Sequence, residues 1–151
     1  MEPVTPTGTA GLPEQQPKSV TRYVTAIARV LLGLLFFVFG LNGFLHFIPQ
    51  PKTPQPAGAM AFAEALMKSG YMFQLVAGTQ VLVGGLLLLN RFVPLALVLI
   101  APVIVNIIAF HLFLAPSGMG PGAAALILEL YLAWAYRDNY RSVLAMRARP
   151  S

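Results

Sequence analysis

The chain has 151 residues, of which 57% are hydrophobic and only 10% charged, with a formal net charge of +5. Soluble domains average about 25% charged residues, so this composition excludes an ordinary soluble globular protein and favours lipid as the solvent. The basic residues flank long apolar runs rather than forming a basic face with interleaved aromatic residues, which excludes nucleic acid as the expected partner, and the absence of cysteine excludes disulfides and thiolate metal sites.

The N-terminal part of the chain combines a polar leader with a long apolar run. Residues 1–21 are rich in Pro, Thr, Gly and Gln, a composition that buries too little surface to order itself, and we predict a disordered tail. Residues 24–48 are long enough to cross a hydrocarbon core of about 30 Å. This run exceeds the roughly 7–15 apolar residues of a signal peptide, so we predict a retained first span.

A proline-rich stretch and a short helix are expected next. Pro51, Pro54 and Pro56 are incompatible with a helix, which places this stretch outside the bilayer. Residues 59–68 then contain helix-forming alanines, together with a Glu64/Lys68 pair at i, i+4 spacing. These features predict a short interfacial helix.

Three more apolar runs complete the predicted membrane domain, which covers residues 22–145. They are residues 71–89, 92–114 and 122–140, the last of which includes a continuation of the helix toward the basic C-terminal tail at 146–151. The predicted fold is therefore all-α, an integral membrane four-helix bundle with a short interfacial helix between spans one and two.

The distribution of basic residues predicts the orientation in the membrane. By the positive-inside rule the side with more Lys and Arg is cytoplasmic, so both termini are expected there, and in a bacterium this describes a multi-pass protein of the inner (plasma) membrane whose first partner is the lipid bilayer. That side carries Lys18, Arg22, Arg91, Arg137, Arg141, Arg147 and Arg149, against Lys52 and Lys68 on the other.

Polar side chains inside the spans are the candidate site residues, because each is costly in lipid. Combining chain direction with helical rise places most of them from the bilayer midplane outward, which predicts a polar cavity reached from outside. They are Arg29, Asn42, His46, Gln74, Gln80, Asn106, His111 and Glu129.

Glu129 and the two histidines allow several interpretations. A carboxylate near the middle of a span must be protonated, paired with a positive charge or hydrated. Glu129 is either a proton-accepting or ligand-anchoring acid, or a structural acid, protonated or paired with Arg, that pins helix register. His46 and His111 either bind a quinone-like carbonyl or another small polar molecule, or face lipid head groups. A haem or metal pair is the weakest of these interpretations, because neither helix has further ligands at close spacing.

The remaining polar residues have structural alternatives too. Arg29 either extends to the head groups or pairs with a carboxylate. Asn106 either binds a ligand or bonds to the backbone groups that Pro102 leaves without a partner. Small residues predict helix-packing seams along both of the first two spans. On the first span the seam comprises Gly33, Phe36, Gly40 and Gly43, and on the second it comprises Gln74, Gly78 and Gly85.

Several segments resemble the DoxX and DoxX-like family of four-span membrane proteins. They are the run from Arg29 to Gly43, the Gly84–Leu89 run in the second span and Phe110-His111 at the end of the third, with Glu129 in the fourth. The resemblance implies a compact four-helix membrane bundle. Members of this family are associated with quinone-linked thiosulfate oxidation, redox-enzyme maturation and oxidative-stress complexes.

The resulting expectation is an accessory subunit of a membrane redox system that binds a quinone or similar small molecule, with a redox-enzyme subunit or a second copy of the chain as partner. No metal is expected. One alternative is a non-catalytic assembly or chaperone-like membrane protein, and another is a small-molecule transporter, which the lack of inverted repeats disfavours. The expected ligand-binding residues are His46, His111, Glu129, Asn42, Asn106 and Gln80.

Overall fold

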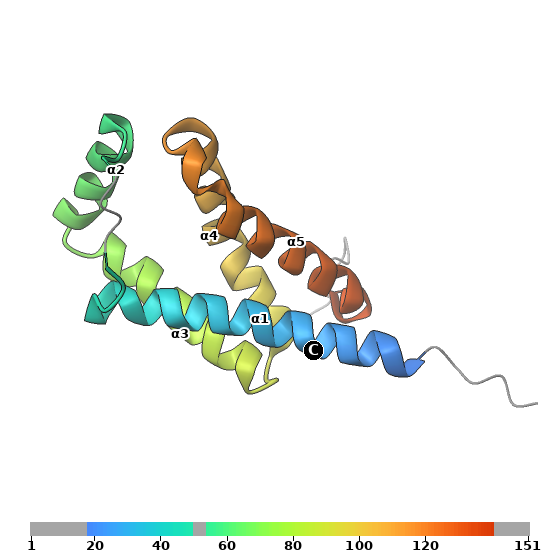
Figure 1. The fold of residues 1–151 in the computed structure, drawn as a ribbon. Coiled ribbons are helices and arrows are strands. Elements are labelled where there is room, and N and C mark those ends of the chain that lie inside the picture. The colour runs from blue at the N-terminus through green and yellow to red at the C-terminus, as the bar shows by residue number, and fades with distance from the viewer. Residues whose placement is uncertain (1–17, 50–53, 141–151) are drawn as a thin grey trace, which may run out of the picture.

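The computed structural model describes residues 18–49 and 54–140, and every regular element in these ranges is helical (Figure 1). Lys18 to Thr21, predicted to belong to the disordered tail, form the first turn of α1, whereas residues 1–17 and the predicted tail 146–151 lie outside the described residues. The elements are α1 (Lys18–Leu45), α2 (Ala57–Lys68), α3 (Met72–Leu88), α4 (Val93–Phe113), η1 (Pro116–Gly118), α5 (Met119–Ala135) and η2 (Arg137–Tyr140).

The described helices have the length and composition of membrane spans. Three qualify alone, Val20–Leu45, Val93–Phe113 and Pro116–Ala135, while α2 and α3 qualify only as a pair that is bent by 90° at its break. By itself α3 has 17 residues, the lower limit of the roughly 17–25 that cross a bilayer. The described residues therefore contain three helices that are long and apolar enough to span a membrane, or four if the bent pair forms one span. The interfacial position of α2 stays a prediction.

The outer surface of the helices is apolar. Large hydrophobic side chains are exposed on every long helix, among them Ile27, Val105 and Ile127, each at about 60% or more of its full surface. Water-soluble monomers rarely expose contiguous apolar patches beyond a few hundred Å². A lipid environment removes that penalty, which supports membrane embedding.

Glycines allow α1 and α3 to lie in backbone contact, and this pair forms the most extensive helix contact of the fold (Figure 1). A Cβ atom added to Gly40 would lie 2.7 Å from the Val81 nitrogen, and one added to Gly84 would lie 2.5 Å from the Phe37 nitrogen. The seam predicted on the first span is therefore confirmed at Gly40.

The seam predicted on the second span was wrong. Gly78 faces open space, Gln74 is exposed, and a Cβ on Gly85 would touch only the rim of a Phe ring at 4.0 Å. Ala77 and Gly84 make the close contacts instead. Gly84 and Gly85 are neighbours in sequence, about 100° apart around the helix, so only one of them can face α1.

α4 and α5 form a second pair, joined through η1, that crosses the first pair (Figure 1). The side chains between the pairs are tightly packed and almost without exposed surface: Leu32, Phe36, Val83, Leu87, Leu97, Ile100, Ile104 and Leu132. α2 stands beside the η1 end of this pair. There the Phe62 ring packs on the Phe110 ring with centroids 5.6 Å apart, and the predicted Glu64/Lys68 ion pair forms at 2.7 Å.

Arg29 bonds to the end of α3, and within the described residues it pairs with no carboxylate. Its guanidinium Nη1 donates to the carbonyl oxygens of Leu87 and Leu88. Those carbonyls belong to the last turn of α3, beyond the regular bonds of the helix, and the Leu87 carbonyl also accepts from the Asn90 N–H at 3.2 Å. A cation there also complements the negative end of the helix dipole.

Candidate functional site

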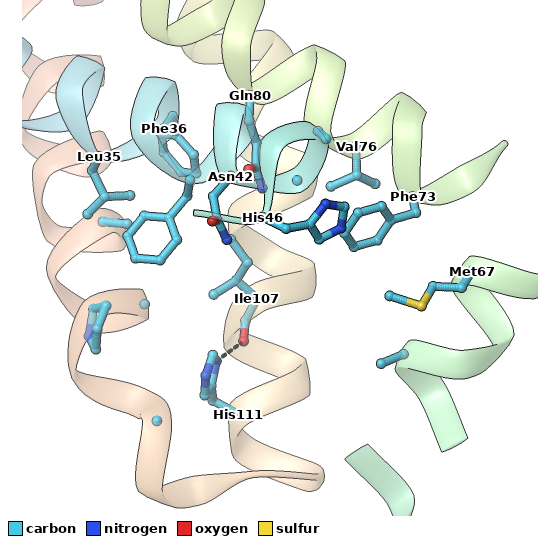
Figure 2. A pocket seen from close by; sticks show the side chains of 18 residues that line it. Leu35, Phe36, Asn42, His46, Met67, Phe73, Val76, Gln80, Ile107 and His111 are labelled. Atoms are coloured by element: carbon cyan, nitrogen blue, oxygen red, sulfur yellow. Dashed lines mark hydrogen bonds between the residues drawn. The ribbon is translucent and has the colours of Figure 1, made fainter. Parts of the chain in front are cut away.

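A cavity of about 500 Å³ lies where α2 meets the end of α1 and the start of α3, against the η1 ends of α4 and α5 (Figure 2). All five α-helices contribute to its walls. Most of the lining is aliphatic or aromatic, and the side chains with this character include Leu35, Phe36, Phe39, Met67, Phe73, Val76 and Ile107. The cavity is thus suited to a largely apolar molecule.

Four polar side chains interrupt this apolar wall, and they are four of the six predicted ligand-binding residues. Asn42 and His46 come from the end of α1, Gln80 from α3 and His111 from α4. Figure 2 shows the two amides on one side of the cavity and the His111 imidazole opposite them. Residues more than sixty positions apart in sequence therefore meet around one space.

Asn42 is held by the turn that follows α1. Its Oδ1 accepts a hydrogen bond from the backbone N–H of Ile48 at 2.7 Å. Because that N–H can only donate, the amide oxygen must face it, and the Nδ2 group keeps its two hydrogens for another acceptor. Asn42 therefore offers the cavity a donor in a fixed orientation.

His46 ends α1 through its backbone. It adopts a left-handed conformation with φ of 51°, and its N–H donates to the Asn42 carbonyl at 2.9 Å, which is the pattern of a helix C-terminal cap. Its ring extends along the cavity rim toward Phe73 (Figure 2). The cap fixes the direction in which the imidazole departs from the backbone. The ring itself stays accessible.

The His111 imidazole is fixed in one tautomer by its own helix. Nδ1 lies 2.8 Å from the Ile107 carbonyl oxygen, which can only accept, so Nδ1 carries the hydrogen. In the neutral ring Nε2 then has a free lone pair. The ring packs against Gly118, where a Cβ would lie 2.6 Å from Nε2, so this position of the imidazole requires glycine.

Gln80 has no hydrogen-bond partner among the residues that the structure describes, although it is only partly exposed. A Cβ added to Gly40 would lie only 2.9 Å from the Cβ of Gln80. The close approach of α1 therefore holds the Gln80 side chain at the cavity wall. A primary amide in an apolar wall is costly without a partner. Gln80 is therefore the residue with the most unused hydrogen-bonding capacity at this site.

The two other predicted site residues lie elsewhere. Glu129 is 6% exposed in the core of the helix crossing, and within the described residues its Oε2 is the buried side-chain atom that lacks a hydrogen-bond partner. No ion pair with Arg accompanies it there, since Arg29 bonds to α3. Asn106 is exposed on the same side of α4 as Pro102, facing away from the cavity.

Three features of the site were not predicted. Met67 and Ala63 of α2 line the cavity, and Gly118 supports the His111 ring. A weak signal existed for α2, because Ala63 and Met67 are four residues apart and share a helix face. Gly118 lies in a Gly/Pro turn where glycine needs no further explanation, so only the folded structure identifies its contact.

Comparisons of the chain with protein-family models, with curated proteins and with solved structures find no match. Among the described residues, no three His, Cys, Asp or Glu side chains come together as metal ligands would. The size of the cavity, its apolar walls and its four polar side chains are therefore what indicate its function.

Proposed function

We propose that the cavity binds a lipophilic small molecule with carbonyl or hydroxyl groups, best represented by a quinone, and that the protein is a DoxX-like accessory subunit of a membrane redox system. The observation that carries this proposal is the meeting of Asn42, His46, Gln80 and His111 in one otherwise apolar cavity of about 500 Å³. Ligand sites of this kind measure roughly 300–1,000 Å³ and use a few polar groups to orient an apolar ligand.

The hydrogen-bonding groups suit both redox forms of a quinone. The free N–H groups of Asn42 and Gln80 can donate to carbonyl oxygens, which only accept. The lone pair on His111 Nε2 can accept from a hydroxyl group. These side chains would hold and orient the ring, while the quinone itself would supply the redox chemistry.

The proposed setting is a bacterial inner membrane with the cavity in the half of the bilayer away from the cytoplasm. The excess of basic residues at the opposite end supports this orientation. A quinone dissolved in the bilayer would then reach the cavity from within the lipid. A redox-enzyme subunit or a second copy of the chain is the proposed partner.

The decisive experiment measures binding of a short-chain benzoquinone to the detergent-purified protein by thermal shift and by isothermal titration calorimetry. Gln80→Leu is the informative variant, because Gln80 bonds to no described residue and its replacement removes only contacts to a ligand. Loss of one neutral hydrogen bond, about 0.5–1.5 kcal/mol, predicts about 2- to 12-fold weaker binding.

Gln74→Leu is the matched control, since Gln74 lies on the same helix but is exposed and outside the cavity. It is expected to bind the benzoquinone like the wild type. Equal binding by the Gln80→Leu protein, or no binding by the wild type to any quinone tested, would contradict the proposal.

A non-catalytic assembly or chaperone-like role is the second candidate, and the local bonds of the polar residues favour it. The Asn42 side chain caps a turn, the His46 backbone caps α1, and the His111 ring bonds to its own helix. Under this alternative, Asn42→Leu lowers the thermal stability, whereas Gln80→Leu removes an unpartnered amide, does not lower stability and changes no binding signal. The Gln80 variant therefore separates the two functions.

A further inference from the structure

A second cavity lies at the opposite end of the helices from the first. It is a cleft of about 640 Å³ between the first turns of α1, the residues that follow α3 and the end of α5. Its wall contains far more polar side chains than that of the first cavity. The lining comprises Thr21, Arg22, Thr25, Ala26, Arg29, Asn90, Trp134, Ala135, Tyr136 and Arg137.

The cleft has a strong positive charge. Arg22, Arg29 and Arg137 come from two helices and converge on it, and no carboxylate is among its described lining residues. Asp138 follows Arg137 in sequence, but it is not part of the lining and has an interaction of its own. Three guanidinium groups around one space repel each other unless an anion sits between them.

Most of the hydrogen-bonding capacity of these arginines is unused within the described residues. Arg29 uses Nη1 to bond to the end of α3, and Arg137 uses Nη1 to bond to the Trp134 carbonyl at 3.0 Å. A guanidinium has five N–H groups, so Nε and Nη2 of both side chains remain. Arg22 bonds to no described residue.

We propose that this cleft binds the phosphate of an anionic phospholipid head group. Guanidinium groups form paired hydrogen bonds with phosphate oxygens, and they are the preferred side chains for this anion. The hydroxyl of Thr21 and the amide of Asn90 lie in the same wall and can bond to the glycerol part of a head group.

A lipid fits the surroundings of the cleft better than a free phosphorylated molecule. Trp134 is 58% exposed at the cleft, and the Arg137 guanidinium lies 4.9 Å from the centre of its ring. An exposed tryptophan in this position is typical of the membrane–water interface. Leu130 and Ile127 are exposed four and seven residues before Trp134 on the same face of α5, so they continue the surface from the cleft toward the middle of the span. Acyl chains can follow this apolar strip while the phosphate stays between the arginines.

The test compares retention of phosphatidylglycerol and phosphatidylcholine by the full-length protein in detergent, measured by native mass spectrometry. We expect selective retention of phosphatidylglycerol by the wild type. Each of Arg22→Gln and Arg137→Gln should weaken it about fivefold, the effect of one basic residue near an anionic lipid surface. Arg91→Gln is the matched control, because Arg91 is exposed near the same end of the molecule but does not line the cleft.

Three results would overturn the proposal. One is an equal loss of phosphatidylglycerol in the Arg91 variant, which would indicate general surface charge. Another is equal retention of both lipids by the wild type. The third is stabilisation by glycerol 1-phosphate equal to that by phosphatidylglycerol at the same phosphate concentration, which would assign the cleft to a free phosphate compound. Arg22→Gln removes no bond within the described fold, so its result stands even if Arg137→Gln fails to fold.

Discussion

Replacing Gly84 by Ala should separate the two helices that form the backbone-to-backbone seam. The new Cβ would lie 2.5 Å from the Phe37 nitrogen, whereas ordinary contacts begin near 3.4 Å, so α1 and α3 must move apart by about 0.9 Å at this level. Overpacking of this kind costs about 1–3 kcal/mol. In lipid the seam is stabilised mainly by van der Waals contact, so the wider gap is not offset by hydrophobic burial elsewhere.

Gly78→Ala on the same helix is the control, because a Cβ there meets nothing within 4 Å. Both substitutions gain the same helix propensity, roughly 0.8–1 kcal/mol, so the difference between the two variants isolates the clash at about 1–3 kcal/mol. The assay is reversible unfolding in mixed micelles followed by circular dichroism. Equal free energies of unfolding for the two variants would refute the close approach of α1 and α3.

Further substitutions test the placement of individual residues around the first cavity. Gly118→Ala should push the His111 ring from its place and break the bond to Ile107, visible as a changed imidazole ¹⁵N spectrum, whereas Gly120→Ala, with nothing within 4 Å, should leave that spectrum unchanged. Asn106→Leu should leave benzoquinone binding unchanged within error, because the side chain faces away from the cavity; a loss above threefold would place Asn106 in contact with the ligand. Glu129→Leu should raise the free energy of unfolding by about 1–3 kcal/mol, the desolvation penalty of an unsatisfied buried polar atom, and a decrease would indicate a partner that Oε2 has outside the described residues.

The two cavities differ in the type of polar side chain that lines them. The first collects neutral amides and imidazoles in an apolar wall, and the second collects guanidinium groups at the end where the charge bias predicts the cytoplasm. The proposals for them are independent, since a variant at Gln80 leaves the cleft intact and a variant at Arg22 leaves the first cavity intact.

Local patterns in the sequence were enough to predict the helical class, the apolar spans and the Glu64/Lys68 pair, because each depends on residues within a few turns of one another. The bent α2–α3 pair was not predictable in the same way. Whether a short helix continues into a span or turns by 90° depends on what its faces contact, here Phe62 against Phe110 of a distant helix.

The sequence by itself determined which segments are helical and apolar, and which few polar residues they contain. Only the tertiary structure decided that Asn42, His46, Gln80 and His111 share a cavity, that Glu129 and Asn106 do not, and that Gly84 rather than Gly78 meets α1. The physical reason is that lipid-facing and core-facing positions of a membrane helix are both apolar, so helical periodicity does not mark the buried face. Which face is buried is set by how the helices cross, and that depends on contacts between residues far apart in the chain.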